Sequence, residues 1–569
     1  MKQLLTFVFF VAIAALVFLP GQVLAAGDTL DVSASGLPLD QVVANDAGAH
    51  HAFRLISTDT TYIYDAAIAA TGNIAFIGVP ASGSKKLPCI QPDVVGGAIP
   101  GTLFSETGNN ANVTFKNIYL LGLSINNSPE FITGTAIQIS ANNVRLVIDN
   151  CVFEEWMGFA IGYNGSMDKF IVTNTKFRNM VHPNQWYVGE VLRNEYPGSV
   201  PTDSIIFQGN TIFCINGYAS APVTKFYVTY FDFSHNSVVY TFKNPFFIFN
   251  VTNAKINNNI FYCNYAGGMN RTEHPWWDEL WSPEIGSVID MDNLDLAKDS
   301  VFDPADVGNA NLPALAEAKR NVEVLNNVYF WPSTMTSYWT AWDDTANVDT
   351  IYTPSWMNGR TTNMFTDKTH WPGFNATGNL NVDPAYGATI PGVLTQAKNG
   401  LLDWWALCRR GTLSNTYWDY AKTQVDTLNP LGWTPTWPLP ESADMQYTNT
   451  PLKTGGTDGL PIGDPNWFGT PMGVSNSPAG VVREFSLAQN YPNPFNPSTR
   501  IEFSLAATSQ VSLKVFNVLG QEVATVAQGT MNSGAHVVTF DASRLSTGVY
   551  FYKLVAGNYT STRKMLLMK

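Results

Sequence analysis

VIDNCVF, residues Val147–Phe153, is an alternating apolar strand followed by an asparagine and, three residues later, an aromatic side chain. The pattern returns as VTNTKF around Asn174, FQGNTIF around Asn210, INNNIF around Asn258 and VLNNVY around Asn326, while FSHNSVV around Asn236 keeps only the asparagine. Successive asparagines of this set are 24, 36, 26, 22 and 68 residues apart. A period in the twenties, lengthened in places by insertions, indicates a solenoid of short strands.

Short strands at this spacing, without helical patterns between them, predict a right-handed parallel β-helix in which each coil buries one face against the next. An asparagine at one phase of the coil can stack on its neighbours and satisfy backbone groups that a buried bend would leave unpaired. The competing fold is an antiparallel sandwich or propeller, which the single asparagine phase disfavours. We therefore interpret the recurring residues as a structural ladder rather than a binding site: Asn150, Asn174, Asn210, Asn236, Asn258 and Asn326.

The beginning of the repeat region carries a further signal. Residues Ser57–Pro92 read STDTTYIYDAAIAATGNIAFIGVPASGSKKLPCIQP, in which IAFIGV is the expected first inward-facing strand. With these residues and the repeats, the chain over about Asp28–Tyr329 resembles the pectate-lyase-like superfamily of parallel β-helix proteins. The resemblance implies the fold more firmly than an activity, because many members of that superfamily cut or bind polysaccharide and others are adhesins.

Composition narrows the classes of partner. The chain has 569 residues, of which 45% are hydrophobic and 14% charged, so it can bury more than one sizeable core. Its formal net charge of −13 opposes the basic footprint that nucleic acid binding needs. The cysteines lack CxxC spacing, so we expect buried thiols and neither a zinc site nor a disulfide scaffold, with a single disulfide left open: Cys89, Cys151, Cys214, Cys263 and Cys408.

The first 25 residues predict a secretory signal peptide. Lys2 precedes an apolar run, Leu4–Leu19, which is followed by the breaker Pro20-Gly21 and by small residues before Ala26. The alternative is a transmembrane anchor, but the run is shorter than the ~20 residues that a span needs. Since no later segment is long and apolar enough to span a bilayer, we expect an exported mature chain without a transmembrane segment.

Candidate catalytic residues follow from what polysaccharide cleavage requires. Glycoside hydrolases of this fold carry paired aspartates and a Gly-His-Gly signature, and the absence of NTD and GHG here disfavours hydrolysis. A lyase of this fold needs a basic residue beside a uronate carboxylate that calcium or basic groups neutralise. The candidates are Arg193, Arg178 and Glu190 as catalytic residues, Lys176 and Glu195 beside them, and Asp149, Glu154 and Glu155 as oxygen ligands for an optional Ca²⁺ ion, with no cofactor required. The alternative is that these charges are solvated or ion-paired.

Tryptophan is concentrated in one part of the chain: thirteen of the sixteen lie between Trp276 and Trp437. Because aromatic rings stack on sugars, we place a carbohydrate site on the lateral face between the coils at Asn150–Asn210 and these aromatics. Its predicted substrate-binding residues are Trp276, Trp277, Trp281, Glu154 and Glu155. The alternative is that the aromatics fill the core of an insertion, with covering helices at 314–325 and 395–410.

Beyond residue 484 the pattern becomes short strands divided by turns. The strands read IEFSL, VSLKVFN, QEVATVA, AHVVTF, GVYFYKLV and YTSTRKMLLM, and they predict a small antiparallel β-sandwich. The linker before it, 475–483, is rich in Ser, Pro and Gly. The prolines of NYPNPFNPSTRIEFSL, residues Asn490–Leu505, exclude helix and sheet interior, so we expect a stiff connector into the first strand.

Four segments of this tail match one pattern: LAQNYPNPFNPSTRIEFSL, VFNVLGQEVATV, LSTGVYFYKL and RKMLLMK. They resemble the type A C-terminal sorting domain of type IX secretion cargo from Bacteroidetes and related phyla. The resemblance implies that an outer-membrane translocon reads residues 484–569. It also implies that the domain is usually removed as the cargo is released or attached to surface lipopolysaccharide.

The fold expected for the whole chain is all-β. Its parts are a signal peptide (1–25), a right-handed parallel β-helix (26–330), an aromatic-rich, partly helical insertion and cap (331–474), a linker (475–483) and the sandwich (484–569). We expect type IX cargo at the cell surface or outside the cell that engages polysaccharide. The alternatives are a polysaccharide lyase acting on an acidic glycan, and a non-catalytic adhesin or structural surface protein.

Deleting residues 484–569 is expected to leave the protein in the periplasm, because the signal peptide carries the chain only across the inner membrane. The measurement is fractionation of a type IX secreting host into periplasm, surface and medium. Undiminished appearance of the truncated chain outside the cell would contradict the predicted route.

Overall fold

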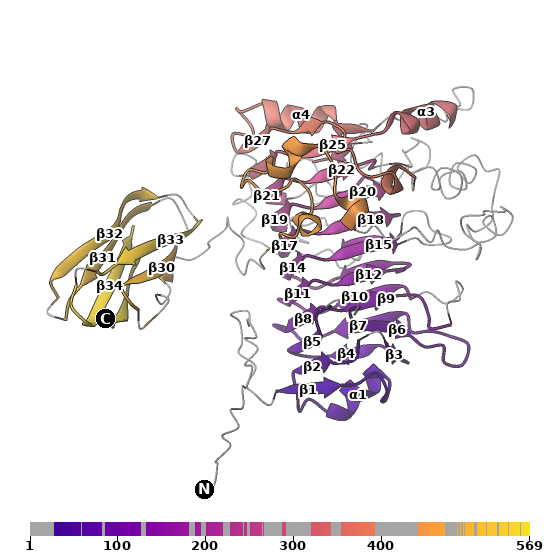
Figure 1. Cartoon of the computed structure of the whole chain (residues 1–569), viewed down its shortest axis with the longest axis horizontal. Coiled ribbons are helices and arrows are strands. Elements are labelled where there is room, and N and C mark those ends of the chain that lie inside the picture. The colour runs from indigo at the N-terminus through magenta and orange to yellow at the C-terminus, as the bar shows by residue number, and fades with distance from the viewer. Residues whose placement is uncertain are drawn as a thin grey trace, which may run out of the picture.

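The computed structural model is a stack of parallel coils followed by a small antiparallel sandwich (Figure 1). The predicted signal peptide (1–25) and linker (475–483) lie outside the described residues. Within the described part of the chain, no helix is long and apolar enough to cross a membrane. The structure describes residues 28–568 apart from 59, 82–85, 127–132, 181–187, 195–200, 220–227, 243, 247–250, 265, 267–286, 292–319, 343–353, 393–441, 473–485, 488–489, 491–492, 494, 506–508, 519, 532–533, 544 and 558.

The coils build three parallel sheets, here called A, B and C, as their strands stack one above another (Figure 1). Sheet A consists, among the described residues, of β1 (Thr29–Val32), β2 (Ala52–Leu55), β5 (Ile74–Gly78), β8 (Asn112–Lys116), β11 (Arg145–Asp149), β14 (Lys169–Thr173), β17 (Thr202–Gln208), β19 (Val228–Ser234), β21 (Val251–Asn257), β24 (Asn321–Leu325) and β27 (Phe374–Thr377). Neighbouring strands pair in parallel, so the predicted parallel β-helix is confirmed.

Sheets B and C complete the coils. Sheet B contains β3 (Thr61–Tyr64), β6 (Cys89–Pro92), β9 (Tyr119–Leu121), β12 (Val152–Glu154), β15 (Lys176–Met180), β18 (Thr211–Ile215), β20 (Ser237–Thr241), β22 (Ile260–Tyr262), β25 (Val328–Phe330) and β28 (Leu380–Asn381). Sheet C contains β4 (Ile68–Ala70), β7 (Thr102–Glu106), β10 (Thr135–Ile139), β13 (Phe159–Tyr163) and β16 (Glu190–Asn194), and β23 (Ser287–Ile289) pairs separately with β26 (Ser355–Met357).

Aromatic residues stack inside the coils because the parallel register places equivalent positions above one another. Phe76 and Phe115, on successive sheet A strands, stack with ring centres 5.3 Å apart, and Phe153 stacks on Phe177 in sheet B at 5.0 Å. These rings are fully buried in one continuous core. Offset stacking adds to the free energy gained from burying apolar area. The motif aromatics Phe153, Phe177 and Phe261 therefore belong to this core, whereas Phe213 belongs to a second apolar cluster.

The turn between sheet A and sheet B of each coil, here called the A–B corner, needs one residue in the left-handed backbone region. That residue is mostly asparagine, which tolerates this region best after glycine. Asn174 has φ 52° and Asn258 has φ 59°, and Gly209 takes the same place in the coil between them with φ 64°. The complete described row is Asn117, Asn150, Asn174, Gly209, His235, Asn258, Asn326 and Gly378.

The next position along the chain carries a second row, which forms the hydrogen-bonded ladder. Asn259 accepts at Oδ1 from the backbone N–H of Asn236 at 2.8 Å, and its Nδ2 donates to Oδ1 of Asn327 at 2.9 Å. The same Nδ2 also donates to the carbonyl of Phe233 at 2.7 Å, so each amide closes one bend and contacts the next. The ladder consists of Asn210, Asn236, Asn259, Asn327 and Asn379.

The six predicted ladder asparagines therefore divide between two neighbouring rows instead of forming one line. Asn210 and Asn236 belong to the ladder. The left-handed row contains the other four: Asn150, Asn174, Asn258 and Asn326. The repeats around Asn258 and Asn326 contain consecutive asparagines, and a pattern match alone does not show which of them turns the backbone and which bonds to the next coil.

Helices cover both ends of the coil stack. At the first coil, α1 (Leu39–Asp46) contacts β3 and β4 and buries Leu39. At the last coils, α4 (Gly359–Thr366) buries Met364 and Phe365, and the ring of Phe365 lies 5.2 Å from that of Phe374 on β27 (Figure 1). Each helix thus shields apolar side chains that the end coils would otherwise expose.

The coil stack continues past the boundary predicted at residue 330. β27 and β28 pair with β24 and β25, so the last coil ends at Asn381, inside the range assigned to the insertion and cap. The covering helix predicted at 314–325 is wrong for its described end, because Asn321–Leu325 forms β24 with Val322 and Val324 in the core. The second predicted helix, 395–410, lies outside the described residues. Helix α3 (Ser333–Trp342) does pack on sheet B, through Met335 and Trp339.

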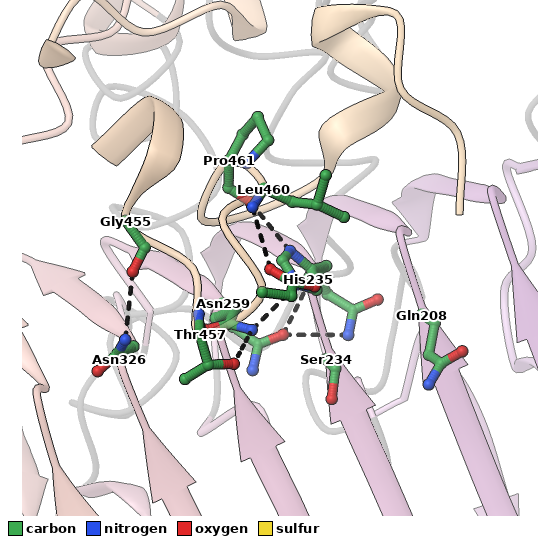
Figure 2. Close-up of polar contacts among 12 residues, drawn as sticks. Gln208, Ser234, His235, Asn259, Asn326, Gly455, Thr457, Leu460 and Pro461 are labelled. Atoms are coloured by element: carbon green, nitrogen blue, oxygen red, sulfur yellow. Dashed lines mark hydrogen bonds and ion pairs between the residues drawn. The ribbon is translucent and has the colours of Figure 1, made fainter. Parts of the chain in front are cut away.

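The segment Ser442–Met472, here called the return segment, runs back along the A–B corners. It contains α8 (Ser442–Met445) and the 3-10 helices η4 (Thr450–Thr454) and η5 (Pro465–Phe468). Its backbone and side chains form hydrogen bonds with the left-handed row, first with the later coils and then with the earlier ones. Figure 2 shows the contacts of Gly455 with Asn326 and of Pro461 with His235. Thr457 contacts Asn258 between these two, and further along Asn466 contacts Gly209 and Met472 contacts Asn174. Trp467 packs beside the middle coils, where its indole N–H donates to the hydroxyl of Thr211.

The C-terminal region forms two antiparallel sheets around their own core. One sheet has the order β29 (Ser486–Leu487), β30 (Ser498–Leu505), β33 (Gly534–Asp541). The other has the order β32 (Glu522–Met531), β31 (Ser509–Phe516), β34 (Gly548–Ala556), β35 (Tyr559–Leu567). Alternate residues of β31, such as Val511, Leu513 and Val515, are buried in the core between the sheets.

The proline-rich connector lies against the edge of β35. Phe495 is buried, donates its backbone N–H to the carbonyl of Leu566 at 2.9 Å and accepts from Met568 at 2.9 Å. Asn493 accepts the N–H of Leu566 through its side chain at 2.8 Å. Prolines lack the N–H that a further strand would need, so a connector of this composition covers the end of an edge strand without extending the sheet.

Replacing Asn259 by alanine is expected to lower the free energy of unfolding of the β-helix by about 3 kcal/mol, because it leaves the N–H of Asn236 and the carbonyl of Phe233 buried and unpaired. The measurement is denaturant unfolding followed by far-ultraviolet circular dichroism. The matched control is Asn375→Ala, at an exposed position of β27. Equal effects of the two substitutions would contradict the structural role of the ladder.

Candidate functional site

The predicted residues Glu154 and Arg178 meet on sheet B. They are register partners on β12 and β15, and Nη2 of Arg178 donates to Oε2 of Glu154 at 2.8 Å. Asn179 donates to the other carboxylate oxygen at 2.9 Å, and the hydroxyl of Tyr119 donates to Oε2. Glu154 is 7% exposed and Arg178 is 9% exposed. The pair is therefore a buried ion pair, and its guanidinium is committed to a carboxylate of the protein itself.

Glu155 lies next to this pair in a constrained position. Its φ is 59° and the residue is 6% exposed. Burial, and after it the negative charge of Glu154, raises the pKa of the Glu155 carboxyl well above its ordinary value, although Arg178 acts in the opposite direction. The site of Glu155, beside the Glu154–Arg178 pair, therefore favours the protonated form of its carboxyl.

Lys176 lies two positions before Arg178 on β15 and is covered by the return segment. Its ammonium group is 4.1 Å from the ring centre of Trp467, whose indole N–H donates to the hydroxyl of Thr211 at 2.7 Å. Burial lowers the pKa of Lys176, and the charge of Asp464 counteracts that effect. Burial raises the pKa of Asp464 to about 6. The aromatic ring thus acts as a structural cover over charged groups.

Glu190 and Arg193, the other two predicted catalytic residues, lie on β16 of sheet C and not on sheet B. Nη1 of Arg193 donates to both carboxylate oxygens of Glu190, at 2.9 and 3.0 Å, and Glu190 is fully buried. The guanidinium also lies 5.9 Å from the ring centre of Phe159. The structure therefore separates the predicted catalytic residues into two ion pairs on different sheets.

The proposed calcium ligands do not fit a cation. Oδ1 of Asp149 accepts from Thr173 and Asn174, at 2.9 and 2.8 Å, and Oδ2 pairs with Lys116 at 2.8 Å. The oxygens of Glu154 likewise face hydrogen-bond donors. A Ca²⁺ ion needs several oxygen atoms directed at one point, whereas these oxygens are already directed at N–H, O–H and ammonium groups. Within the described residues, no group of three or more His, Cys, Asp and Glu is placed to hold a metal ion.

The predicted aromatic substrate-binding residues Trp276, Trp277 and Trp281, together with Glu195, lie outside the described residues. Of the predicted carbohydrate site, the structure thus describes the charged floor. Of that floor, Glu154, Arg178, Glu190 and Arg193 are held in ion pairs, which agrees with the alternative of ion-paired charges, whereas Glu155 is buried beside one of these pairs.

A cleft of about 580 Å³ opens at the first coil, where no functional residue was predicted from the sequence. One wall is α1 with the turn after it, Asp40–His51, and the other is β4 with its flanking turns, Ala66–Ile74. The space stays open because many lining residues are small, among them Ala44, Ala47, Ala69 and Gly72. The volume lies in the range of small-ligand sites, roughly 300–1,000 Å³.

Two histidines that line this cleft are each paired with an aspartate, of which Asp46 also lines the cleft and Asp28 does not. Nδ1 of His50 lies 2.6 Å from Oδ1 of Asp46, and Nδ1 of His51 lies 2.8 Å from Oδ1 of Asp28. Burial alone would raise the pKa of Asp46, but hydrogen bonds from His50 outweigh it and the pKa falls below its ordinary value. Asp40 accepts the backbone N–H of Asp65 at 3.0 Å. The cleft therefore presents carboxylates and imidazoles among alanine and glycine residues.

Sequence reasoning missed this cleft because its walls are far from the asparagine repeats. The available signal was the pair of adjacent histidines, His50-His51, followed by the alanine-rich DAAIAATGN, residues Asp65–Asn73. Small residues leave space for a cleft and paired ionisable residues make it polar. Only the packing of α1 on β4 brings these two segments of the first coils together.

The described chain consists of an extended parallel β-helix and a C-terminal β-sandwich that has its own core. Residues 489–568 match the family model described as the Secretion system C-terminal sorting domain. The predicted type IX sorting domain is thereby confirmed, and it indicates a secreted cargo protein destined for the cell surface or the medium. Comparison with curated proteins and with solved structures gave no match. The resemblance of the β-helix to pectate-lyase-like proteins stays a prediction.

Glu154→Gln is expected to lower the free energy of unfolding by about 3 kcal/mol, because it leaves the buried guanidinium of Arg178 without a counter-charge. The measurement is differential scanning calorimetry of the full chain. The control is Asp31→Asn, which breaks the exposed ion pair with Arg54 and is expected to cost about 1 kcal/mol or less. A loss for Glu154→Gln no larger than that of the control would contradict the assignment of a buried structural pair.

Proposed function

We propose that this type IX cargo protein binds polysaccharide through its β-helix without cleaving it, and that the cleft beside α1 is the sugar site. The single observation that carries the proposal is the cleft itself: about 580 Å³, open to solvent, with an alanine-rich wall and a few convergent polar groups. Such a combination is the usual form of a small-ligand or sugar subsite.

The chemistry of the cleft suggests the class of sugar. Carboxylate oxygens accept hydrogen bonds from sugar hydroxyls, and Asp40 contributes a carboxylate to one wall, whereas both oxygens of Asp46 already accept from His50. The nearby Asp65 adds negative charge, and burial together with the charges of Asp40 and Asp93 raises its pKa. Negative charge repels uronates, so the cleft suits neutral or amino sugars better than an acidic glycan.

Binding without cleavage is supported by the state of the predicted bases. Arg178 is paired with Glu154 at 2.8 Å, and Arg193 with Glu190 at 2.9 Å. An eliminase base has to take a proton from the sugar at hydrogen-bond distance, in a position the substrate reaches. A guanidinium that is held by a buried carboxylate is better suited to stabilising the coil than to that step.

The test is a glycan array probed with the full chain, followed by affinity measurements on the best neutral or amino-sugar ligand. Ala69→Trp, at an exposed position of β4 inside the cleft, is expected to weaken binding about tenfold or more by filling the space. Asp40→Asn, which keeps the acceptor for Asp65 and removes the charge, is expected to weaken binding severalfold.

The matched control is Leu37→Trp, which adds the same side chain at a residue 55% exposed just before α1 and outside the cleft lining. It should leave affinity unchanged. The proposal fails if no glycan binds the parent chain, or if Ala69→Trp binds as the parent does. Release of unsaturated uronate, followed by its ultraviolet absorbance, would instead support the lyase alternative.

A further inference from the structure

The sorting domain differs in charge from the rest of the chain. Residues 489–568 contain six basic and three acidic residues, whereas the whole chain has a net charge of −13. A basic domain at the end of an acidic protein indicates an anionic partner. The position of its lysines in the sheet shows which surface would meet that partner.

Three lysines and two phenylalanines gather on the outer face of the four-stranded sheet. Their neighbours along β31 and β34, such as Val515 and Tyr552, point into the core, so these residues point away from it. The strand register places Phe516 opposite Phe551, and Phe551 opposite Lys564. We call this surface the Lys–Phe face: Lys514, Phe516, Phe551, Lys553 and Lys564.

Lys514 and Lys553 are direct cross-strand partners on this face. Like charges at directly opposed positions, with Cβ atoms roughly 5 Å apart, destabilise a sheet. Lys514 is partly compensated by Glu522 at 2.8 Å, but that pair is exposed, with side chains 35% and 41% accessible. A local arrangement that costs stability is expected at positions used for binding.

Phe551 provides an apolar centre for the same face. It is 36% exposed and is flanked in the register by Phe516 on one side and Lys564 on the other. An aromatic centre surrounded by charged residues is the usual arrangement of a protein–protein binding surface, in which the aromatic is the anchor and the charges select the partner.

We propose that the Lys–Phe face is the surface by which the sorting domain docks onto an acidic, apolar-centred protein surface of the secretion machinery. Partner carboxylates would neutralise Lys514 and Lys553 together, which turns their mutual repulsion into a gain on binding. A membrane is the less suitable partner, because electrostatic lipid binding typically uses about four to eight clustered basic residues. The proposal concerns the sorting domain and is independent of sugar binding by the β-helix.

The test is export of the full chain in a host that carries the type IX machinery. Lys553→Glu and, separately, Phe551→Ser are each expected to reduce the extracellular and surface fraction about tenfold, with the chain retained in the periplasm. Thermal unfolding of the purified Lys553→Glu chain should be unchanged or shifted upward, because the substitution removes the repulsion with Lys514. Lys553→Gln provides the same comparison if the charge reversal impairs folding.

The control is Arg500→Glu, an equal charge change at an exposed position of β30 in the other sheet. It is expected to be exported as the parent chain is. Normal export of Lys553→Glu, or equal loss in Arg500→Glu, would overturn the proposal. Lys553-dependent binding of the full chain to vesicles of phosphatidylcholine with phosphatidylglycerol would overturn it in favour of an anionic lipid.

Discussion

The hydrogen bonding of the A–B corner is the constraint on which the β-helix depends. Each coil must bend sharply there while its backbone groups are buried between the coils above and below, where water cannot pair them. The ladder side chains solve this by accepting an N–H of the preceding coil and donating to a carbonyl of that same coil, as Asn259 does with Asn236 and Phe233. Because each amide bonds its counterpart in the next coil, the ladder also holds the register in which the aromatic rings stack.

The two rows of the corner perform different tasks. The ladder row faces the coil stack, whereas the left-handed row offers its side chains to the return segment, from Asn326 to Asn174. That segment covers Lys176 with Trp467, and buried ion pairs on sheets B and C join Glu154 to Arg178 and Glu190 to Arg193. The asparagine rows and buried ion pairs of the described coils therefore stabilise the fold. Groups that remain open to a ligand lie at the end of the stack beside α1 and on the C-terminal sandwich.

The β-helix and the sorting sandwich have different surfaces. The β-helix belongs to an acidic chain, and the proposed sugar site is a cleft whose lining includes Asp40 and Asp46. The sorting sandwich is basic and exposes lysines around Phe551, which suits an acidic partner. The proline-rich connector covers the end of one edge of that sandwich through Phe495, which pairs with Leu566 and Met568 at the end of β35. A cargo domain with a covered edge can travel through the cell envelope with less risk of pairing with other strands.

The repeats, their period and the tail motifs were enough to predict a parallel β-helix and a type IX sorting domain, because local alternation and turn chemistry are encoded by neighbouring residues. Tertiary structure alone decided the rest. It placed Asn258 and Asn259 in different rows, carried the coils on to Asn381, and paired Arg178 with Glu154 from the preceding coil. It also formed the cleft by packing α1 on β4. In a solenoid, a residue's partner lies one coil away, at a separation that varies with each insertion, and stacking of the coils determines which residues meet.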